Sequence, residues 1–543
     1  MKRFLSIVFT LIFFTDAFAC TNLLISKGAS KDGSVMVSYA ADSHTRYGTL
    51  NFMPSANYRA GEMVEVREWG PRRLLGYIPQ VTHTYNVIGN MNEKQVLIGE
   101  STWGGLKQLK DTSAILDYGS LIYITLQRAS TAREAIEIFT SLLDKYGYAS
   151  TGESISFADP HEVWFMDIIG RLPKYENGEN KNKGAVWVAV RIPDGYISAH
   201  ANCARITTFP LNDPQNCLYA KDVISQAREM GLFNGKDEEF SFADTYNPLT
   251  FSLMRACEAR VWSFFNRHGD VDMMQYIDYA RGDNPKNRMP LYVKVKEKLS
   301  VKDVADMMRD HFEGTEFDMT KGIAAGGNEV PYRWRPSSFV IDGKKGLNER
   351  AIATQQTGFW FVGQCREWLP DEIGGLFWFA VDDAGTSPLS PFYACSNKIS
   401  NHYALGNGNM IKYSETSMFW LQNRIAQFAY LRYNQIGKEV REVIDEHENA
   451  MIELVAETDK AALEMKSTKK RVKYLTGFSV KSADELFSKW NDFDKYLLVK
   501  YIDGNTKYQN EDGSFKDNGY TPTVPIAPMF PGYSDEYKRA VAK

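Results

Sequence analysis

The sequence predicts a protein of the α+β class, in which a largely antiparallel sheet structure precedes a helical C-terminal part. Short strand-like segments separated by turns occur over residues 21–37 and 85–100 and return between residues 154 and 201. A helical pattern over residues 131–147 lies between these groups, and a longer one covers residues 414–462. Groups of strands interrupted by few helices indicate segregated α and β layers, not a regular strand–helix alternation.

The first nineteen residues are predicted to be an export signal. A short basic start precedes an apolar run over residues 4–14, and Ala17-Phe18-Ala19 supplies the small-x-small pattern that signal peptidases accept. The apolar run is too short to span a bilayer, which takes about 20 residues. We therefore expect an exported chain, periplasmic or extracellular, that begins at Cys20 and is not stably inserted in a membrane.

The start of the mature chain is predicted to form two strands joined by a turn. Residues 22–26 are apolar and β-compatible, the Lys-Asp-Gly segment at residues 31–33 has turn chemistry, and residues 34–38 resume the strand. Asp32 is thereby a turn residue. A second strand-rich stretch follows over residues 85–100 and contains its own polar turn.

A helix is predicted to follow over residues 131–147. Thr131 and Glu134 form a capping-box pattern, the apolar side chains recur at helical spacing, and Gly147 ends the pattern. Four strand-like segments come next in the chain. They cover residues 154–158, 163–168, 185–191 and 196–201.

The C-terminal part changes to a helical character. Met418, Leu421, Ile425 and Phe428 fall at helical spacing, which indicates a helix packing on the main body. The polar, Gly- and Pro-containing stretch after Asp503 is expected to be loosely held near its end.

Composition and charge indicate an ordinary globular protein without a nucleic-acid partner. Of 543 residues 44% are hydrophobic and 24% charged, and the formal net charge is −4. This slightly acidic balance gives no electrostatic support for binding nucleic acid or an anionic membrane. The oligomeric state is left open by the sequence.

The cysteines match neither a small disulfide scaffold nor a zinc site, because their spacing is wide and irregular and no CxxC or HExxH motif occurs. They are Cys20, Cys203, Cys217, Cys257, Cys365 and Cys395. Without Cys20 an odd number remains, so at least one is free, and the pairing of the others is open. Asp382-Asp383 has no companion ligands at a suitable spacing and is interpreted as a loop acid pair. No metal or other cofactor is predicted.

Cys20 itself allows three interpretations. A lipid anchor fits poorly, because lipoprotein signals usually begin with Leu at the third position before the cysteine and have no bulky residue like Phe18 at the second. A disulfide has no partner that the spacing selects. In the third interpretation, cleavage after Ala19 leaves Cys20 with a thiol and a free α-amine. The ordinary pKa of a thiol is about 8.5 and that of an α-amine about 7.7–8.0. One residue then holds both a nucleophile and a base.

The residues that follow favour the third interpretation. CTNLLISKGASKDGSVMVSYAADSH at residues 20–44 resembles the start of the C69 dipeptidases, which are N-terminal-nucleophile hydrolases related to bile-salt and penicillin-V amidases. Later blocks are similar to that family in the same order, and the resemblance covers residues 20–391. They include IGESTWGG at 98–105, KGAVWVAVRIPDGYISAHANCARI at 183–206, CEARVWSFF at 257–265 and QQTGFWFVGQCREWLPDEIGGLFWFAVDDA at 355–384.

The resemblance implies a fold, a domain division and an activity. The fold is an αββα sandwich of two antiparallel sheets with a helical C-terminal extension. Residues 1–19 are the signal, residues 20–400 the peptidase domain, and residues 401–543 a mainly helical extension that packs on it. The activity is hydrolysis of dipeptides or short peptides through an acyl-enzyme on Cys20. An acyl-amide hydrolase of the bile-salt or penicillin-V amidase type is the alternative, and a peptide-binding surface lipoprotein is the non-enzyme alternative.

The resemblance also assigns candidate site residues. Cys20 is the nucleophile and, through its amine, the base. Asp42, at the end of the second strand, matches the family's acidic residue, which would hold the α-amine. Asn202 matches an oxyanion-stabilising Asn, a role that typically contributes about 10²–10³ in rate.

Arg260 is a candidate either to orient the site or to bind a substrate carboxylate, which a guanidinium grips with two hydrogen bonds. Glu100 and Thr102 are candidates to line the pocket and meet the substrate's α-amine. His200 is interpreted as structural, and Cys203, where relatives commonly have Gln, as a neighbour without chemistry of its own.

One departure from the family concerns thiol activation. Many relatives carry an Arg three residues before the acid at Asp42, where this chain has Tyr39. A nearby Arg lowers the pKa of a thiol, so Tyr39 removes one expected source of activation. Arg46 is the nearest alternative in the sequence.

Overall fold

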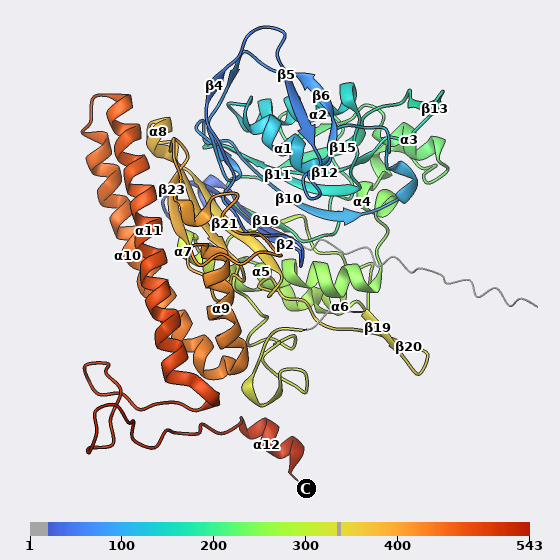
Figure 1. The fold of residues 1–543 in the computed structure, drawn as a ribbon. Coiled ribbons are helices and arrows are strands. Elements are labelled where there is room, and N and C mark those ends of the chain that lie inside the picture. The colour runs from blue at the N-terminus through green and yellow to red at the C-terminus, as the bar shows by residue number, and fades with distance from the viewer. Residues whose placement is uncertain (1–19, 334–337, 543) are drawn as a thin grey trace, which may run out of the picture.

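The computed structural model describes residues 20–333 and 338–542 (Figure 1). The predicted export signal, residues 1–19, lies outside the described residues. Two large antiparallel sheets face each other in the centre of the molecule, with helices on both outer sides. The predicted mixed α and β composition with antiparallel sheets is therefore confirmed.

The first sheet has seven strands in the order β18-β16-β1-β2-β21-β22-β23. Its N-terminal strands β1 and β2 lie in the middle of the sheet. The strands are β18 Tyr292–Lys294, β16 Tyr196–His200, β1 Thr21–Ile25, β2 Val35–Asp42, β21 Thr357–Cys365, β22 Gly375–Val381 and β23 Ser390–Tyr393.

The second sheet has eight strands in the order β17-β15-β12-β11-β10-β9-β8-β3. They are β17 Cys217–Tyr219, β15 Ala185–Arg191, β12 Val163–Gly170, β11 Gly152–Ala158, β10 Leu97–Gly104, β9 Met91–Asn92, β8 Val87–Ile88 and β3 Phe52–Met53. Four small two-stranded sheets are present in addition to the two large sheets. Their strands are β4 Ala56–Asn57 with β7 His83–Thr84, β5 Met63–Arg67 with β6 Leu74–Pro79, β13 Tyr175–Glu176 with β14 Glu179–Asn180, and β19 Ser338–Ile341 with β20 Lys344–Leu347.

Helices α1 Tyr118–Leu126 and α2 Ala132–Tyr146 cover the outer face of the second sheet, and α5 Ala259–His268 and α7 Val301–Met307 cover that of the first (Figure 1). The shorter helices lie around these layers. They are α3 Val223–Glu229, α4 Phe242–Tyr246, α6 Ile277–Arg281 and α8 Asp371–Gly374.

The alternation of side chains along β1 explains how the layers are held together. Successive residues of a strand point to opposite faces of the sheet. Leu23 and Ile25 therefore join the core beneath α5 and α7, whereas Cys20 and Leu24 join the core between the two sheets. The same rule makes the first residue of the predicted mature chain face the second sheet.

The predicted elements of the N-terminal half are confirmed with small shifts of their ends. β15 has the predicted bounds, and Asp32 accepts hydrogen bonds from the N–H and the hydroxyl of Ser34, as expected of a turn residue. Helix α2 begins after Thr131, whose hydroxyl accepts the N–H of Glu134 at 3.1 Å. The Glu134 carboxylate accepts the N–H of Ser130 instead of completing a capping box.

The C-terminal part contains three consecutive long helices, α9 Met418–Leu431, α10 Lys438–Leu463 and α11 Thr468–Tyr501, followed by the short α12 Asp535–Val541. The predicted helical stretch is α9 and α10, divided by a π-helical turn at Tyr433–Gly437. Helix α11 was not predicted. Its buried face includes Thr476, Ser479 and Ser482, so small polar residues interrupt the apolar stripe.

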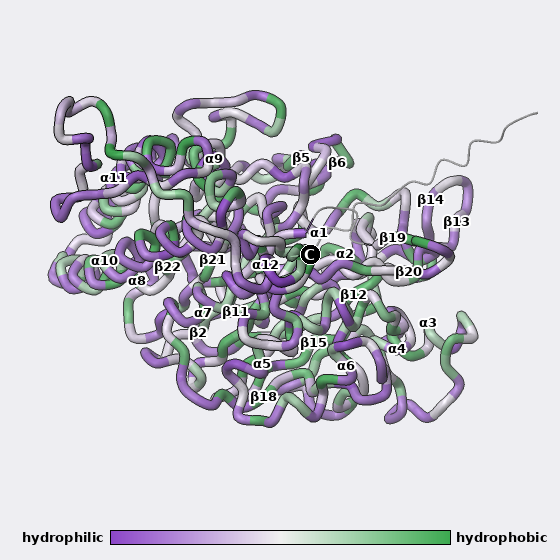
Figure 2. Tube along the Cα trace, turned by 90° about the horizontal axis from the view of Figure 1, so that it is seen from below, coloured by the Kyte–Doolittle hydropathy of each residue, from purple (hydrophilic) through white to green (hydrophobic). Residues whose placement is uncertain are grey.

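Helices α9, α10 and α11 contact β22 or β23 at one edge of the first sheet. Their tubes alternate between hydrophilic and hydrophobic turns, as expected of helices with one buried side (Figure 2). Within residues 20–333 and 338–542, no helix combines the length and apolar character that a membrane span requires, and this includes the 34-residue α11. The division at residue 400 stays a prediction.

Candidate active site

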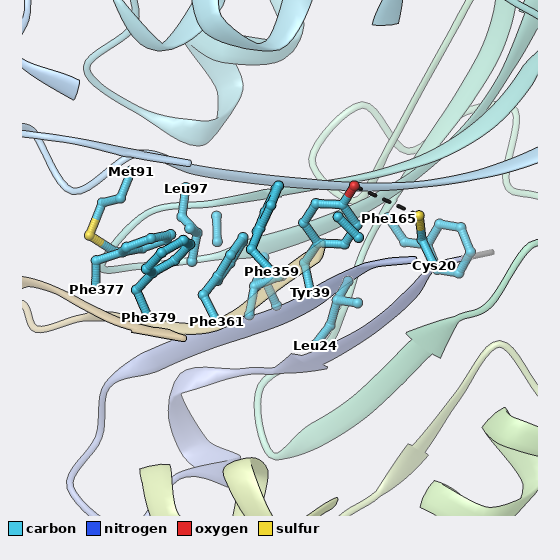
Figure 3. Close-up of a cluster of buried hydrophobic side chains, with 14 of the residues drawn as sticks. Cys20, Leu24, Tyr39, Met91, Leu97, Phe165, Phe359, Phe361, Phe377 and Phe379 are labelled. Atoms are coloured by element: carbon cyan, nitrogen blue, oxygen red, sulfur yellow. Dashed lines mark hydrogen bonds between the residues drawn. The ribbon is translucent and has the colours of Figure 1, made fainter. Parts of the chain in front are cut away.

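Cys20 lies immediately before β1, at one end of the layer between the two sheets (Figure 3). The residue is only 3% exposed. Its main-chain nitrogen donates a hydrogen bond to Asn202 Oδ1 at 2.8 Å. Its thiol lies 3.7 Å from the hydroxyl of Tyr39 and 3.8 Å from Oε1 of Glu100. Residues far apart in the sequence thus meet around one sulfur atom.

The second sheet approaches β1 closely at this point. Asn22, two residues after Cys20 on the same face, donates from Nδ2 to the carbonyl oxygen of Glu100 at 2.6 Å. A side-chain carbon at Gly99 would overlap the Asn22 amide oxygen. The glycine in the IGESTWGG block therefore permits the contact that brings Glu100 beside Cys20.

Arg260, from α5, holds the backbone around Cys20. It is fully buried, and all five guanidinium N–H donors are used. Nη1 donates to the carbonyl of Cys20 at 2.8 Å and Nη2 to Oδ1 of Asn202 at 3.0 Å. The other acceptors are Thr21 Oγ1, the carbonyl of Ala201 and the carbonyl of Ala256.

These contacts leave no donor of Arg260 for a substrate. Binding of a substrate carboxylate by Arg260 would require breaking hydrogen bonds that are buried in the core, and the substrate-binding role stays a prediction. The contacts agree with the other role that the sequence allowed, which is orientation of the site.

Asn202 lies just beyond the end of β16 with a left-handed backbone, φ 62°. Asn adopts this conformation more readily than most residues. Its Nδ2 donates to the carbonyl of Thr102 at 2.6 Å, and its backbone N–H donates to Ser101 Oγ at 3.3 Å. The Asn202 side chain thus joins Cys20 of the first sheet to the strand β10 of the second.

His200, next to Asn202, forms hydrogen bonds between the two sheets. Its Nδ1 lies 2.7 Å from Ser101 Oγ and its Nε2 lies 2.7 Å from Ser156 Oγ. Complete burial places the pKa of His200 well below its usual range, so the ring is neutral at physiological pH. A neutral ring held at both nitrogens has a structural role, in line with the prediction.

Asp42 ends β2, where the register with β21 shifts. Its carboxylate accepts hydrogen bonds from Arg350 Nη2 and Thr357 Oγ1, each at 2.6 Å. The backbone N–H of Asp42 favours the thiolate of Cys20 and acts to lower the thiol pKa, while the carboxylate charge raises it. Asp42 is therefore close to the Cys20 thiol. The main-chain nitrogen of Cys20 contacts Asn202.

Glu100 belongs to a group of buried polar side chains on the inner face of the second sheet. Its Oε1 accepts a hydrogen bond from the hydroxyl of Tyr39. Thr102, on the same face of β10, donates from Oγ1 to Oε1 of Glu153 on β11 at 2.9 Å. Glu100 and Glu153 are each 1% exposed.

Glu153 was missed by the sequence prediction. It lies in the β11 segment Gly152–Ala158, whose seven residues are all buried. A charged residue within such a strand is itself a signal, because carboxylates are rarely buried without a specific reason. Only the pairing of β10 with β11, which sets Thr102 opposite Glu153, reveals that this residue belongs to the site.

The resting thiol is strongly disfavoured from ionising. Burial raises the pKa of Cys20 well above its usual value, and the charges of Glu100 and Asp42 raise it further. The Tyr39 hydroxyl and the Asp42 N–H act in the opposite direction. Arg46 lowers the pKa of Glu100 and lies over the ring of Trp69, with its guanidinium carbon 5.0 Å from the ring centre. Its positive charge therefore acts on Glu100.

A cavity of about 1180 Å³ lies beside this group. Its lining includes Arg46, Trp69, Tyr123 and Phe359, and β5 with the turn that follows it forms one wall. The ring of Phe359 packs edge-on against Tyr39 at 5.7 Å between ring centres. Arg46 and Phe359 thus connect the cavity to the surroundings of the thiol.

The described residues contain one acidic group compact enough to hold a metal ion, Asp306, Asp445 and Glu448. Lys302 and Arg309 already form ion pairs with it. The predicted loop pair Asp382-Asp383 is not part of this group, and Asp383 accepts a hydrogen bond from Tyr430 at 3.0 Å. All six cysteines are free thiols, so no disulfide joins any of them.

Comparison with known proteins identifies the family to which this chain belongs. The model of peptidase family C69 matches residues 49–446, so the chain belongs to peptidase family C69. The matched residues include Glu100, Asn202 and Arg260. They begin after Cys20 and Asp42, so the family match does not test the roles of these two residues.

Several relatives are similar to this chain along most of their length. A probable dipeptidase of Latilactobacillus sakei is 24% identical over 508 residues, which covers 90% of this chain and 96% of the relative. A probable dipeptidase of Salmonella dublin is 24% identical, and the similarity covers 72% of this chain and 85% of the relative. A probable dipeptidase B of Streptococcus pyogenes serotype M1 is 22% identical, and the similarity covers 83% of this chain and 85% of the relative.

Proposed function

We propose that this peptidase is an exported dipeptidase that uses Cys20 as an N-terminal nucleophile. The observation that carries the proposal is the cluster in which Asn202 and Arg260 hold both the nitrogen and the carbonyl of Cys20. A structural cysteine would not require its backbone to be held on both sides by buried side chains. The names of the relatives support dipeptides as substrates.

The α-amine is the proposed base. Residues 1–19 still precede Cys20 in the full-length chain, so its nitrogen is an amide, which stands in for the amine of the mature enzyme. Asn202 Oδ1 accepts one N–H of this nitrogen. An amide oxygen cannot donate, so the contact orients the amine without engaging its lone pair. That lone pair is then available to accept the thiol proton.

The reaction follows from this arrangement. The thiol proton moves to the α-amine, and the sulfur attacks the peptide carbonyl, whose π electrons move to oxygen. When the tetrahedral intermediate collapses, the carbon–nitrogen bond breaks, and the leaving nitrogen takes the proton from the α-ammonium. Water then gives a proton to the amine and cleaves the thioester, which releases the acid and restores the thiol. The steps require no cofactor.

Other residues have proposed supporting roles. The Asn202 amide lies beside the nucleophile and is assigned to stabilise the oxyanion through Nδ2. Arg260 is a positioning residue, and Asp42 favours a charged α-amine through its carboxylate. Glu100 and Thr102 are assigned to the part of the site that receives the substrate's α-amine.

The finer description of the fold and location belongs to the same proposal. Two antiparallel sheets stacked between helices, with a cysteine at the start of a central strand, support an N-terminal-nucleophile αββα sandwich. The pattern of residues 1–19 supports removal of an export signal after Ala19 and a periplasmic or extracellular location.

The proposal is tested by the N-terminal mass of the secreted protein and its substrate profile. We expect a mature chain that begins with an unmodified Cys20 and hydrolyses dipeptides. Turnover of N-acyl glycines without turnover of dipeptides would replace this proposal with an acyl-amide hydrolase. A diacylglyceryl adduct on Cys20, with no hydrolysis of either class, would indicate a peptide-binding lipoprotein.

A further inference from the structure

Two buried carboxyl groups, Glu100 beside the thiol and Glu153 on the neighbouring strand, form no ion pair with the other described residues. Glu100 and Glu153 are diagonal neighbours on adjacent strands, since Thr102 is directly opposite Glu153. Tyr39 and Thr102 supply hydrogen bonds to one oxygen of each. Among the described residues, the second oxygen of each carboxyl group, Oε2, finds no donor.

The lack of donors to the two Oε2 atoms is explained if one carboxyl group is protonated, because its O–H can then donate to the other carboxyl group. Two adjacent buried carboxylates cannot both ionise without a large electrostatic penalty. Burial and the charge of Glu100 raise the pKa of Glu153 well above its usual value. The pKa of Glu100 is raised by burial, while Tyr39, Glu153 and Arg46 lower it. Glu153 therefore keeps the proton, and Glu100 carries the single negative charge.

This charge lies where it opposes catalysis. Glu100 Oε1 is 3.8 Å from the Cys20 sulfur, and Tyr39 stands where many relatives carry a positively charged Arg. Thiolate formation in the free enzyme would place two negative charges side by side in a buried layer. A positive charge brought to Glu100 would remove this obstacle.

We propose that the substrate supplies this charge: its α-ammonium group binds the Glu100 carboxylate, neutralises the negative charge of the pair and thereby permits the thiolate to form. This inference rests on the proposed dipeptidase function and adds to it a dependence of nucleophile activation on a free, protonated substrate N-terminus. The proton of Cys20 still moves to its own α-amine, and the pair keeps its one proton throughout.

The other charged and titratable groups around Glu100 and Glu153 do not neutralise the negative charge of the pair. Tyr118 and Tyr148 are neutral in this environment, because burial raises the pKa of each well above its usual value. Asp42 and Asp117 are acidic and add negative charge. Arg46 offsets part of the charge on Glu100 and also packs on Trp69.

The first test compares two substrates on the mature wild-type enzyme. Alanyl-phenylalanine and propionyl-phenylalanine differ only in the α-amine. We expect kcat/KM to be at least about 10²-fold higher for the free-amine compound, because a buried group built to bind a substrate group rejects the analogue that lacks it. Equal turnover would overturn this inference and leave the peptidase proposal intact. Turnover of neither compound or of any other dipeptide would overturn both.

The second test separates activation from folding. Glu100→Gln removes the charge that opposes the thiolate, so alkylation of Cys20 by iodoacetamide near neutral pH should become faster, as followed by mass spectrometry. The same variant should lose about 10²-fold in kcat/KM on alanyl-phenylalanine. On propionyl-phenylalanine its rate should not fall. A merely structural lesion would lower both the alkylation rate and the turnover of both compounds, and that result would overturn the inference.

Two further variants complete the test. Glu153→Gln mimics the protonated partner, so this variant should still favour the free-amine substrate. Loss of that preference in Glu153→Gln, with its retention in Glu100→Gln, would overturn the assignment of the charge to Glu100. Glu176→Gln, on the exposed β13 hairpin, is the matched control and should change neither alkylation nor substrate preference.

Discussion

The two ends of the layer between the sheets differ sharply, although both lie between the same two sheets. At one end Phe361, Phe377 and Phe379 pack ring against ring, with centres 4.5 Å apart for Phe361 and Phe377 (Figure 3). At the other end Cys20 and Glu100 are buried beside polar groups that lack partners. The inner face of the first sheet thus changes from an aromatic core on β21 and β22 to a buried polar site beside β1.

This difference between the aromatic and the polar end separates residues that stabilise the fold from residues that serve function. Burial of apolar rings stabilises the folded chain, whereas burial of an unpaired carboxyl group costs free energy. Such a cost is expected to persist only where function requires the group. The aromatic end should therefore control stability, and the polar end should control activity. Each of the following predictions tests this separation.

The largest effect is expected at the nucleophile. Cys20→Ala should reduce peptide hydrolysis by at least about 10⁴-fold, because the covalent intermediate cannot form. Its thermal unfolding temperature should stay close to that of the parent. Cys217→Ala, which removes a buried thiol on β17, should keep its activity. A mature chain with one extra residue before Cys20 should be nearly as inactive as Cys20→Ala, because the base becomes an amide. Full activity in either modified chain would contradict the mechanism.

A stability effect of similar size is expected at the aromatic end. Phe377 is completely buried between Phe361 and Phe379. Phe377→Ala should lower the free energy of unfolding by about 3–5 kcal/mol, measured by urea denaturation. The activity of the molecules that remain folded should be close to that of the parent. Loss of activity in fully folded Phe377→Ala would show that the two ends are coupled.

Asn202 allows the amide group and the backbone to be tested apart. Asn202→Gly keeps the left-handed backbone accessible and removes the amide, so kcat should fall by about 10²–10³-fold with a small change in stability. Asn202→Ala should lose the same activity and about 1 kcal/mol of stability in addition, because alanine is strained at φ 62°. Equal activity of Asn202→Gly and the parent would remove Asn202 from the catalytic site.

The smallest effect concerns the dependence of stability on pH. The pKa of Glu153 is raised above its ordinary value of about 4.5, so the folded protein holds this proton to higher pH than the unfolded chain. Above the ordinary value, rising pH therefore favours unfolding until the folded pKa is passed. Glu153→Gln cannot titrate and should lose less stability between about pH 4.5 and 8.

Thermal unfolding of both proteins across that pH range measures the difference. Glu453→Gln, an exposed position on α10, serves as the control and should follow the parent. A pH dependence of Glu153→Gln that is identical to that of the parent would show that Glu153 does not hold a proton in the folded state.

Local signals in the sequence were sufficient for many of the elements. The bounds of β15, the start of α2 at Thr131 and the turn at Asp32 follow from alternation, capping and turn chemistry, which depend on neighbouring residues. Helix α11 was missed because its packed face contains serines and threonines. One of these, Ser479, accepts the backbone N–H of Tyr393 in β23.

The candidate site was predictable in part. Cys20, Asp42, Glu100, Thr102, Asn202 and Arg260 were all singled out, and all lie in one region. The role of Arg260 was not determined, since only the fold shows that its five donors are occupied. Glu153 was absent because its neighbour Glu100 is 53 positions away along the chain and becomes adjacent only when β10 pairs with β11.

By itself, the sequence determined the family blocks and most of the strands and helices in their order, and it predicted the cleavage that would make Cys20 the first residue. The tertiary structure decided which buried groups share the layer with the thiol. Local chemistry acts over a few residues, whereas the electrostatics of a buried site depend on every charge within several ångströms, whatever its position in the chain. For this reason Tyr39 and Glu100 lie beside the Cys20 thiol, and Glu153 lies beside Glu100. The negative charge that they bring near the thiol is the one that the substrate is proposed to neutralise.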